Sequence, residues 1–150
     1  MDLDVRFHNM SKAMKTQLYM ENLTTIFNPQ ALFCDGTSFY RYPAEPDVND
    51  RVRLRFRSAR ENLDQVVLVF NEQRIEMEKI FNDRLFDYYE AYVQLGSRQV
   101  YYYFELHCGQ RVFYYNSVGL CSSVEEYYHF TMTPGFTTPD WAKGAVFYQI

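Results

Sequence analysis

Cysteine and histidine are scarce in this chain of 150 residues, which contains three of each. Neither residue type has the spacing of a zinc-ligand motif, and the histidines fall on different predicted elements. These patterns argue against a zinc site and against a cysteine–histidine nucleophile. The odd number of cysteines favours reduced structural thiols in a reducing compartment. The residues concerned are Cys34, Cys108, Cys121, His8, His107 and His129.

Glycine, positive charge and long apolar runs are also limited. The chain has six glycines and no glycine-rich phosphate loop. Its net charge of −4 at pH 7 argues against nucleic acid or an anionic membrane as a partner. No apolar run approaches the roughly 20 residues of a membrane-spanning helix, and the first ten residues contain no apolar signal core. We therefore expect a cytoplasmic protein that has no cofactor and that binds neither nucleic acid nor membrane.

One cluster of oxygen-bearing side chains, Asp47, Asn49 and Asp50, has the ligand chemistry of a calcium loop. It lacks a glycine at the turning position and a glutamate at the offset that would supply bidentate ligation. A plain turn is therefore the favoured interpretation, and no metal is expected.

Aromatic residues are abundant instead, and the 14 tyrosines and 13 phenylalanines favour strands over helices. Residues 51–57 alternate arginine with apolar side chains, and we expect these arginines on the solvated side of a strand rather than in a phosphate-binding patch. Short strands recur roughly every 8–12 residues, which predicts an antiparallel β-sandwich of about eight strands. The predicted strands are 37–42, 51–57, 66–70, 75–79, 86–95, 100–107, 110–115 and 127–132, with turns that include 71–74 and a loop at 116–126.

Residues 100–115, VYYYFELHCGQRVFYY, are predicted to form the central hairpin, with Cys108-Gly109 as its two-residue turn. Side chains alternate between the two faces of a strand, so one face is apolar and the other carries tyrosines. The apolar set is Val100, Tyr102, Phe104 and Leu106, and the outward set is Tyr101, Tyr103, Glu105 and His107. A turn at Cys108-Gly109 would pair Phe104 with Phe113 and Tyr103 with Tyr114. We expect a sheet that is buried on one side and offers a stacking surface on the other.

The sequence divides into three segments. Residues 1–30 are an N-terminal extension with weak periodicity, and residues 31–136 are the sandwich. Residues 137–150 are predicted to be a linker followed by an apolar strand at 145–150 that belongs to a second domain.

The string PDWAKGAVFYQI at residues 139–150 resembles the start of the catalytic barrel in glycoside hydrolase family 13, the α-amylase family. It is most similar to the neopullulanase, cyclomaltodextrinase and maltogenic amylase branch, in which an N-terminal immunoglobulin-like module, carbohydrate-binding module family 34, precedes the barrel. The order of predicted strands from residue 31 onward also matches that module. The resemblance implies an all-β, immunoglobulin-like antiparallel β-sandwich and makes residues 145–150 the truncated first strand of the barrel.

The resemblance also implies a function. The parent protein would hydrolyse α-glucans with retention, using acids that lie beyond residue 150, so no residue of this chain is expected to be catalytic. The predicted role of the sandwich is to bind an α-glucan or maltooligosaccharide, or to shape the active-site entrance. Sugar C–H faces stack on aromatic rings, and the expected carbohydrate-binding residues are Tyr89, Tyr101, Tyr103 and Tyr114.

A second hypothesis is that these tyrosines pack against a protein, which would be the chain's own catalytic barrel or the second subunit of a homodimer. The family's sugar-stacking tryptophans are not matched here, since the single tryptophan, Trp141, lies in the predicted linker. In this branch of the family the module can cover the active-site mouth of a second subunit, and a tryptophan-poor aromatic surface fits that role as well. Carbohydrate binding and protein docking without sugar affinity both stay open on the sequence.

Overall fold

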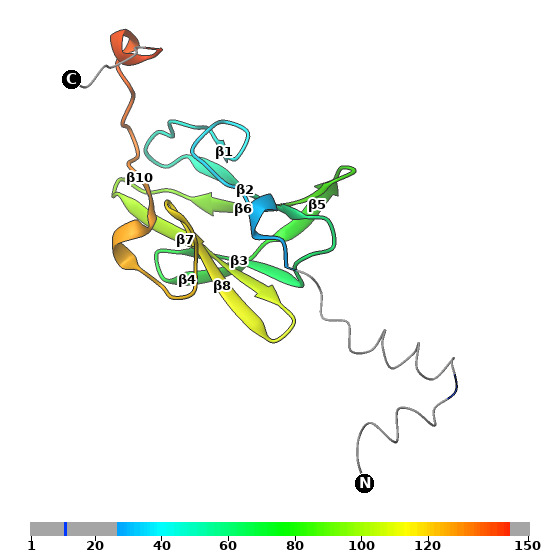
Figure 1. Cartoon of the computed structure of the whole chain (residues 1–150). Helices are drawn as coiled ribbons and strands as arrows, with labels where there is room; N and C mark the ends of the chain where they lie inside the picture. Colours follow the sequence, from blue (N-terminus) through cyan, green and yellow to red (C-terminus); the bar gives the residue numbers. More distant parts are fainter. Residues whose placement is uncertain (1–10, 12–26, 145–150) are drawn as a thin grey trace, which may run out of the picture.

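The computed structural model describes residue 11 and residues 27–144, and its strands form two antiparallel sheets that pack face to face (Figure 1). The predicted all-β, immunoglobulin-like antiparallel sandwich is confirmed, with ten strands in the described part instead of about eight. The four-stranded sheet contains, in order, β1 (Arg41–Tyr42), β2 (Arg51–Ala59), β6 (Phe86–Gln94) and β5 (Glu78–Asn82). The six-stranded sheet contains β4 (Gln73–Glu76), β3 (Gln65–Phe70), β7 (Val100–Cys108), β8 (Arg111–Asn116) and β9 (Gly119–Cys121), and β10 (Phe130–Met132) also pairs with β7.

Helical structure in this part of the chain consists of single 3₁₀ turns. They are η1 (Pro29–Ala31), η2 (Glu126–Tyr128) and η3 (Asp140–Ala142). None of these described turns is long and apolar enough to cross a bilayer. The predicted strand at 145–150 and most of the predicted extension at 1–30 lie outside the described residues.

One apolar core lies between the sheets. Phe56 of β2 and Phe104 of β7 are fully buried, and their ring centroids are 4.8 Å apart. Burial of a side chain of this size contributes about 1.5–3 kcal/mol. The inward face predicted for the central hairpin is confirmed, because its members are all buried: Val100, Tyr102, Phe104 and Leu106.

The prediction of one strand at 75–79 is wrong, since the chain changes sheets there. β4 pairs with β3 in one sheet, whereas β5 pairs with β6 in the other. Met77 lies between them, is 4% exposed, and donates its backbone N–H to the carbonyl oxygen of Val66 at 2.9 Å. Burying the Met77 side chain in the core makes the crossing favourable.

The predicted register of the central hairpin is also wrong. The two-residue turn is Gly109-Gln110, so Phe104 lies opposite Tyr115 and not Phe113. The Asp64 carboxylate accepts the Gly109 N–H at 2.6 Å and holds this glycine, with φ 61°, at the first position of the turn. The pairing moves by two residues, so each side chain keeps its predicted face.

Two of the predicted strands are shorter in the structure than expected. The strand at 37–42 reduces to β1, because the Asp35 carboxylate accepts hydrogen bonds from the Thr37 N–H at 2.9 Å and hydroxyl at 2.6 Å and fixes a turn. The strand at 127–132 reduces to β10, with η2 before it, and the loop predicted at 116–126 contains β9.

Candidate functional site

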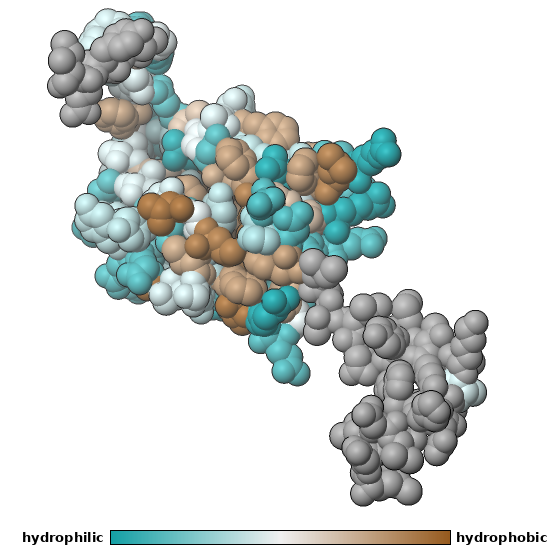
Figure 2. All heavy atoms as spheres, in the orientation of Figure 1, coloured by the Kyte–Doolittle hydropathy of each residue, from teal (hydrophilic) through white to brown (hydrophobic). Residues whose placement is uncertain are grey.

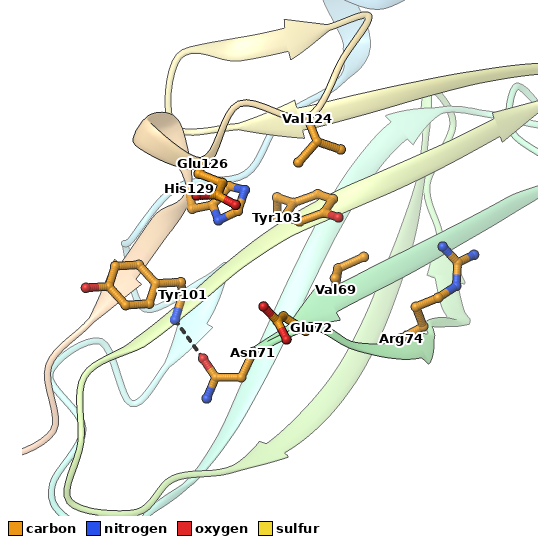
Figure 3. Close-up of a pocket in the computed structure, with 9 residues that line it drawn as sticks. All are labelled: Val69, Asn71, Glu72, Arg74, Tyr101, Tyr103, Val124, Glu126 and His129. Carbon is orange, nitrogen blue, oxygen red and sulfur yellow. Dashed lines mark hydrogen bonds between the residues drawn. The ribbon is translucent and has the colours of Figure 1, made fainter.

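A pocket of about 710 Å³ lies on the outward face of the six-stranded sheet (Figure 3). This volume falls within the roughly 300–1,000 Å³ typical of small-molecule sites. β7 crosses the pocket, the β3–β4 hairpin borders it on one side, and the segment between β9 and β10 borders it on the other. The lining residues are Val69, Asn71, Glu72, Arg74, Tyr101, Tyr103, Val124, Glu126 and His129.

Tyr101 and Tyr103 reach the pocket because they take the outward side of β7, opposite the buried Tyr102. Tyr101 is 49% exposed, and its hydroxyl donates to Gln99 Oε1 at 3.2 Å. Tyr103 stacks on His129, with ring centroids 4.7 Å apart and an interplanar angle of 27°. Burial raises the pKa of Tyr103. A tyrosine phenol is protonated at neutral pH in any case, so Tyr103 has a hydrogen to donate.

The β3–β4 turn places Asn71 and Glu72 beside Tyr101. Both turn residues are left-handed, with φ 45° and 68°. The Asn71 N–H donates to the Tyr101 carbonyl oxygen at 3.0 Å, and Asn71 Oδ1 accepts the Tyr101 N–H at 3.1 Å (Figure 3). These two hydrogen bonds join the turn to β7 and fix the position of the neighbouring Glu72 backbone.

Arg74 borders the pocket and is held by Glu105, which is 7% exposed. The Arg74 Nη2–H donates to Glu105 Oε1 at 2.9 Å, and its Nη1 contacts Oε2. His107 Nε2 lies 2.7 Å from Glu105 Oε1. The hydrogen bond from Arg74 is the main reason that the pKa of Glu105 lies below its usual value. An ionised Glu105 thus orients the guanidinium at the edge of the pocket.

This arrangement suits a sugar. The tyrosine rings offer apolar faces to sugar C–H groups. Glu72 and Glu126 offer carboxylate oxygens to hydroxyl donors, and Arg74 offers N–H groups to hydroxyl acceptors. A concave site with aromatic walls and a few placed polar groups is the usual form of a small-ligand site.

The structure brings together some of the predicted sugar-binding residues and excludes one. Tyr101 and Tyr103 line the pocket, and Tyr114 lies beside Tyr103 with ring centroids 6.1 Å apart. The prediction for Tyr89 is wrong as to position, because Tyr89 lies opposite Phe56 on the core side of β6 and is 4% exposed. Its ring packs in the interior and cannot stack on a surface sugar. For the other three tyrosines, sugar binding stays a prediction.

Sequence reasoning missed most of the pocket's border. The turn at 71–74 was expected, and an asparagine at a hairpin turn is a signal for left-handed backbone, but nothing in the sequence shows that this turn lies beside Tyr101. Val124, Glu126 and His129 fall between β9 and β10. The path of that segment over the sheet depends on long-range contacts such as the His129–Tyr103 stack, which no local pattern encodes.

The four-stranded sheet carries a different outward surface, on which arginines of β2 lie against aromatic rings. Arg55 lies between Phe39 and Phe81, with its guanidinium carbon 4.4 Å and 5.1 Å from the ring centroids. It also donates to the buried Glu90 carboxylate, at 2.9 Å from Nε. The expectation of a solvated arginine face is therefore only partly correct, because Arg51 is exposed but Arg55 is 8% exposed.

Several apolar side chains of this second surface remain in contact with solvent. We name it the aromatic face and define it by Phe33, Phe39, Ile80, Phe81 and Leu85, which are 37%, 45%, 47%, 38% and 64% exposed. Figure 2 shows a small group of brown, apolar side-chain atoms near the end of β5, bordered by teal, hydrophilic ones. The rings of Phe39 and Phe81 lie on either side of Arg55, and exposed apolar surface of this kind can mark a contact site for other molecules.

The calcium alternative has no support from the turn that carries it. Asp50 Oδ2 accepts the Asp47 N–H at 2.8 Å, and Asn49 is left-handed with φ 66°. Asp50 is thus used to close the turn. Across residues 27–144, the structure contains no cluster of three or more histidine, cysteine or acidic side chains that could hold a metal ion.

The sheets and their order define an immunoglobulin-like β-sandwich domain, with a pocket of aromatic and polar side chains on the outward face of one sheet. Residues 30–135 match the family described as the N-terminal Ig-like domain of α-amylase, and the chain belongs to this family.

Individual relatives agree with this membership. The chain is 27% identical to neopullulanase 2 of Thermoactinomyces vulgaris over 136 residues, which cover 81% of this chain and 23% of the relative. It is 29% identical to a cyclomaltodextrinase of Geobacillus thermopakistaniensis over 121 residues, covering 68% of this chain and 21% of the relative. The chain therefore spans less than a quarter of the length of these curated relatives.

Solved structures support the fold. One cyclomaltodextrinase superposes with a TM-score of 0.62 at 22% identity, covering 79% of this chain and 22% of that one. A maltogenic amylase from S. marinus superposes with a TM-score of 0.55 at 17% identity, covering 82% of this chain and 17% of that one.

Proposed function

We propose that this chain is the substrate-side N-terminal domain of an α-glucan hydrolase, and that its pocket binds an α-glucan or maltooligosaccharide. The names of the relatives, neopullulanase and cyclomaltodextrinase, support α-glucan as the substrate class of the whole protein. Retaining hydrolysis would take place on a catalytic barrel that follows this domain.

The observation that carries the proposal is the pairing of rings and polar groups in one pocket. Tyr101 and Tyr103 stand on β7 beside Glu72, and Arg74 is oriented by Glu105. Stacking removes the apolar face of a glucose ring from water, while the carboxylate and guanidinium groups replace the water bound to its hydroxyls. The rings and the polar groups thus match the two chemically different surfaces of a sugar, its apolar C–H face and its hydroxyls.

Isothermal titration calorimetry of the chain with maltohexaose tests the proposal. We expect saturable binding, weaker binding of maltotriose, and no binding of cellohexaose, because a β-linked chain has a different shape. Absence of maltohexaose binding at millimolar concentration would contradict the proposal.

A second candidate function, protein docking, is favoured by the aromatic face of the four-stranded sheet. In a longer protein this face would meet the catalytic barrel or a second copy of the chain. Sedimentation velocity tests directly whether two copies of the chain associate. We expect concentration-dependent dimers that Phe81→Ser abolishes and that Val118→Ser, at a position 62% exposed outside this face, preserves. A strictly monomeric wild-type chain would contradict self-docking.

A further inference from the structure

The β3–β4 turn contains a glutamate in a conformation that suits glycine better. Asn71 and Glu72 are the two central residues between β3 and β4, with φ 45° and 68°. Two-residue turns with both φ values positive favour asparagine followed by glycine, because a Cβ atom is strained in left-handed backbone. Asparagine fits the first position, but Glu72 does not fit the second.

No structural role of the Glu72 side chain compensates for this strain. The turn is joined to β7 by Asn71, through its N–H to the Tyr101 carbonyl at 3.0 Å and its Oδ1 from the Tyr101 N–H at 3.1 Å. Within residues 27–144, the Glu72 carboxylate takes part in no ion pair or hydrogen bond. Backbone strain that the fold does not need is a feature of functional positions.

The carboxylate is placed where a ligand would use it. Glu72 lines the pocket, and Figure 3 shows its carboxylate on the pocket side of the turn, with Val69 of the same hairpin nearby and the Arg74 guanidinium farther away. An ionised carboxylate only accepts hydrogen bonds, and its two oxygens can receive two donors at once. Two adjacent hydroxyls of one sugar ring present that pair of donors.

We propose that Glu72 determines the specificity of the pocket by accepting hydrogen bonds from the adjacent 2- and 3-hydroxyls of a glucose unit stacked on a pocket tyrosine. This inference rests on the proposed function of the pocket. An α-1,4-glucan leaves both hydroxyls free on every internal unit, so the selected ligand class is a glucan with an unmodified vicinal diol.

The test uses the opposite effects of Glu72→Gly on stability and on binding. Removing the Cβ relieves the left-handed strain, so Tm rises by about 2–4 °C in a chain of this size. The same change removes the acceptor, so affinity for maltotriose falls about tenfold or more. Glu72→Gln keeps the side-chain length and one acceptor oxygen, and it should bind with intermediate affinity at unchanged Tm.

Glu61→Gly is the matched control, because Glu61 is also an exposed glutamate with positive φ, 53°, and it is not among the residues of the pocket. It should raise Tm similarly and leave maltotriose affinity unchanged. Maltotriose methylated at its 2- and 3-hydroxyls should bind the wild-type chain as weakly as maltotriose binds the Glu72→Gly chain.

The outcomes separate the two claims. A wild-type chain that binds neither maltohexaose nor maltotriose overturns the proposed function. A wild-type chain that binds, together with a Glu72→Gly chain of equal affinity, overturns the role of Glu72 alone. A fall in Tm for Glu72→Gly would assign Glu72 a structural role and would also overturn the inference.

Discussion

The ion pair between Arg55 and Glu90 gives a quantitative prediction for the stability of the sandwich. Both side chains are nearly enclosed, with 10% and 8% exposure, and the Arg55 guanidinium lies between the rings of Phe39 and Phe81. Glu90→Gln removes the negative charge and leaves Arg55 charged in a site that little water reaches. Removing one partner of a buried pair costs about 3–5 kcal/mol.

The lower end of that range applies here. The amide oxygen that Glu90→Gln introduces can still accept one hydrogen bond, and the two rings continue to stabilise the cation by about 1–2 kcal/mol. We therefore expect this substitution to lower the free energy of unfolding by about 3 kcal/mol. That is a large part of the roughly 5–15 kcal/mol typical of a domain, yet it leaves the protein folded.

Urea unfolding at pH 7, followed by near-ultraviolet circular dichroism of the tyrosines, measures this change. Trp141 is 77% exposed and would report poorly on the core. The control Arg55→Met with Glu90→Leu removes the pair but leaves the partly exposed Arg53, whose Nε lies 3.7 Å from Glu90 Oε1, and it should lie closer to wild type than Glu90→Gln does. A loss below about 1 kcal/mol for Glu90→Gln would show that water reaches the pair, and would refute the reasoning.

Two further predictions concern the pocket. Tyr103→Ala should lower maltotriose affinity about tenfold in calorimetry, because it removes the ring that stacks on His129 within the pocket. Tyr127→Ala is the control, since Tyr127 is 90% exposed and lies outside the pocket, and it should leave the affinity unchanged. Equal losses of affinity in the two variants would count against a stacking site. Glu105 has a pKa below its usual value of about 4.3, chiefly through Arg74, so its contribution to stability is complete above that value and is lost as the pH falls toward the lower folded pKa. Glu105→Gln should therefore unfold with a shallower pH dependence than wild type between about pH 5 and pH 3, and an identical dependence would show that the ion pair does not form.

The sequence predicted the parts of the fold that depend on local alternation. β2 and β7 each place an uninterrupted apolar series on one face. Both were assigned correctly because, when one face of a strand is buried, an alternating pattern shows which side chains face the core. The sheet change at Met77 was missed because residues on both sides of it keep strand-like patterns. Only the pairing partners, β3 for β4 and β6 for β5, reveal the crossing.

The pocket could be predicted only in part. Tyr101 and Tyr103 were identified because a tyrosine-bearing face opposite an apolar face is visible in the sequence. The placement of Tyr89 was wrong because Tyr88 and Tyr89 are adjacent, and the sequence does not say which of them faces inward. Glu72 was not identified as a pocket residue because its position there depends on a left-handed turn that lies beside β7 only in the folded chain.

The central claim is that the outward pocket of the six-stranded sheet binds an α-glucan. Chemical-shift mapping of the ¹⁵N-labelled chain during titration with maltotriose tests it most directly. The claim predicts saturable shifts concentrated at residues 71–74, 101–103 and 124–129, with residues of the aromatic face unaffected. Shifts confined to the aromatic face, or none at millimolar maltotriose, would contradict it.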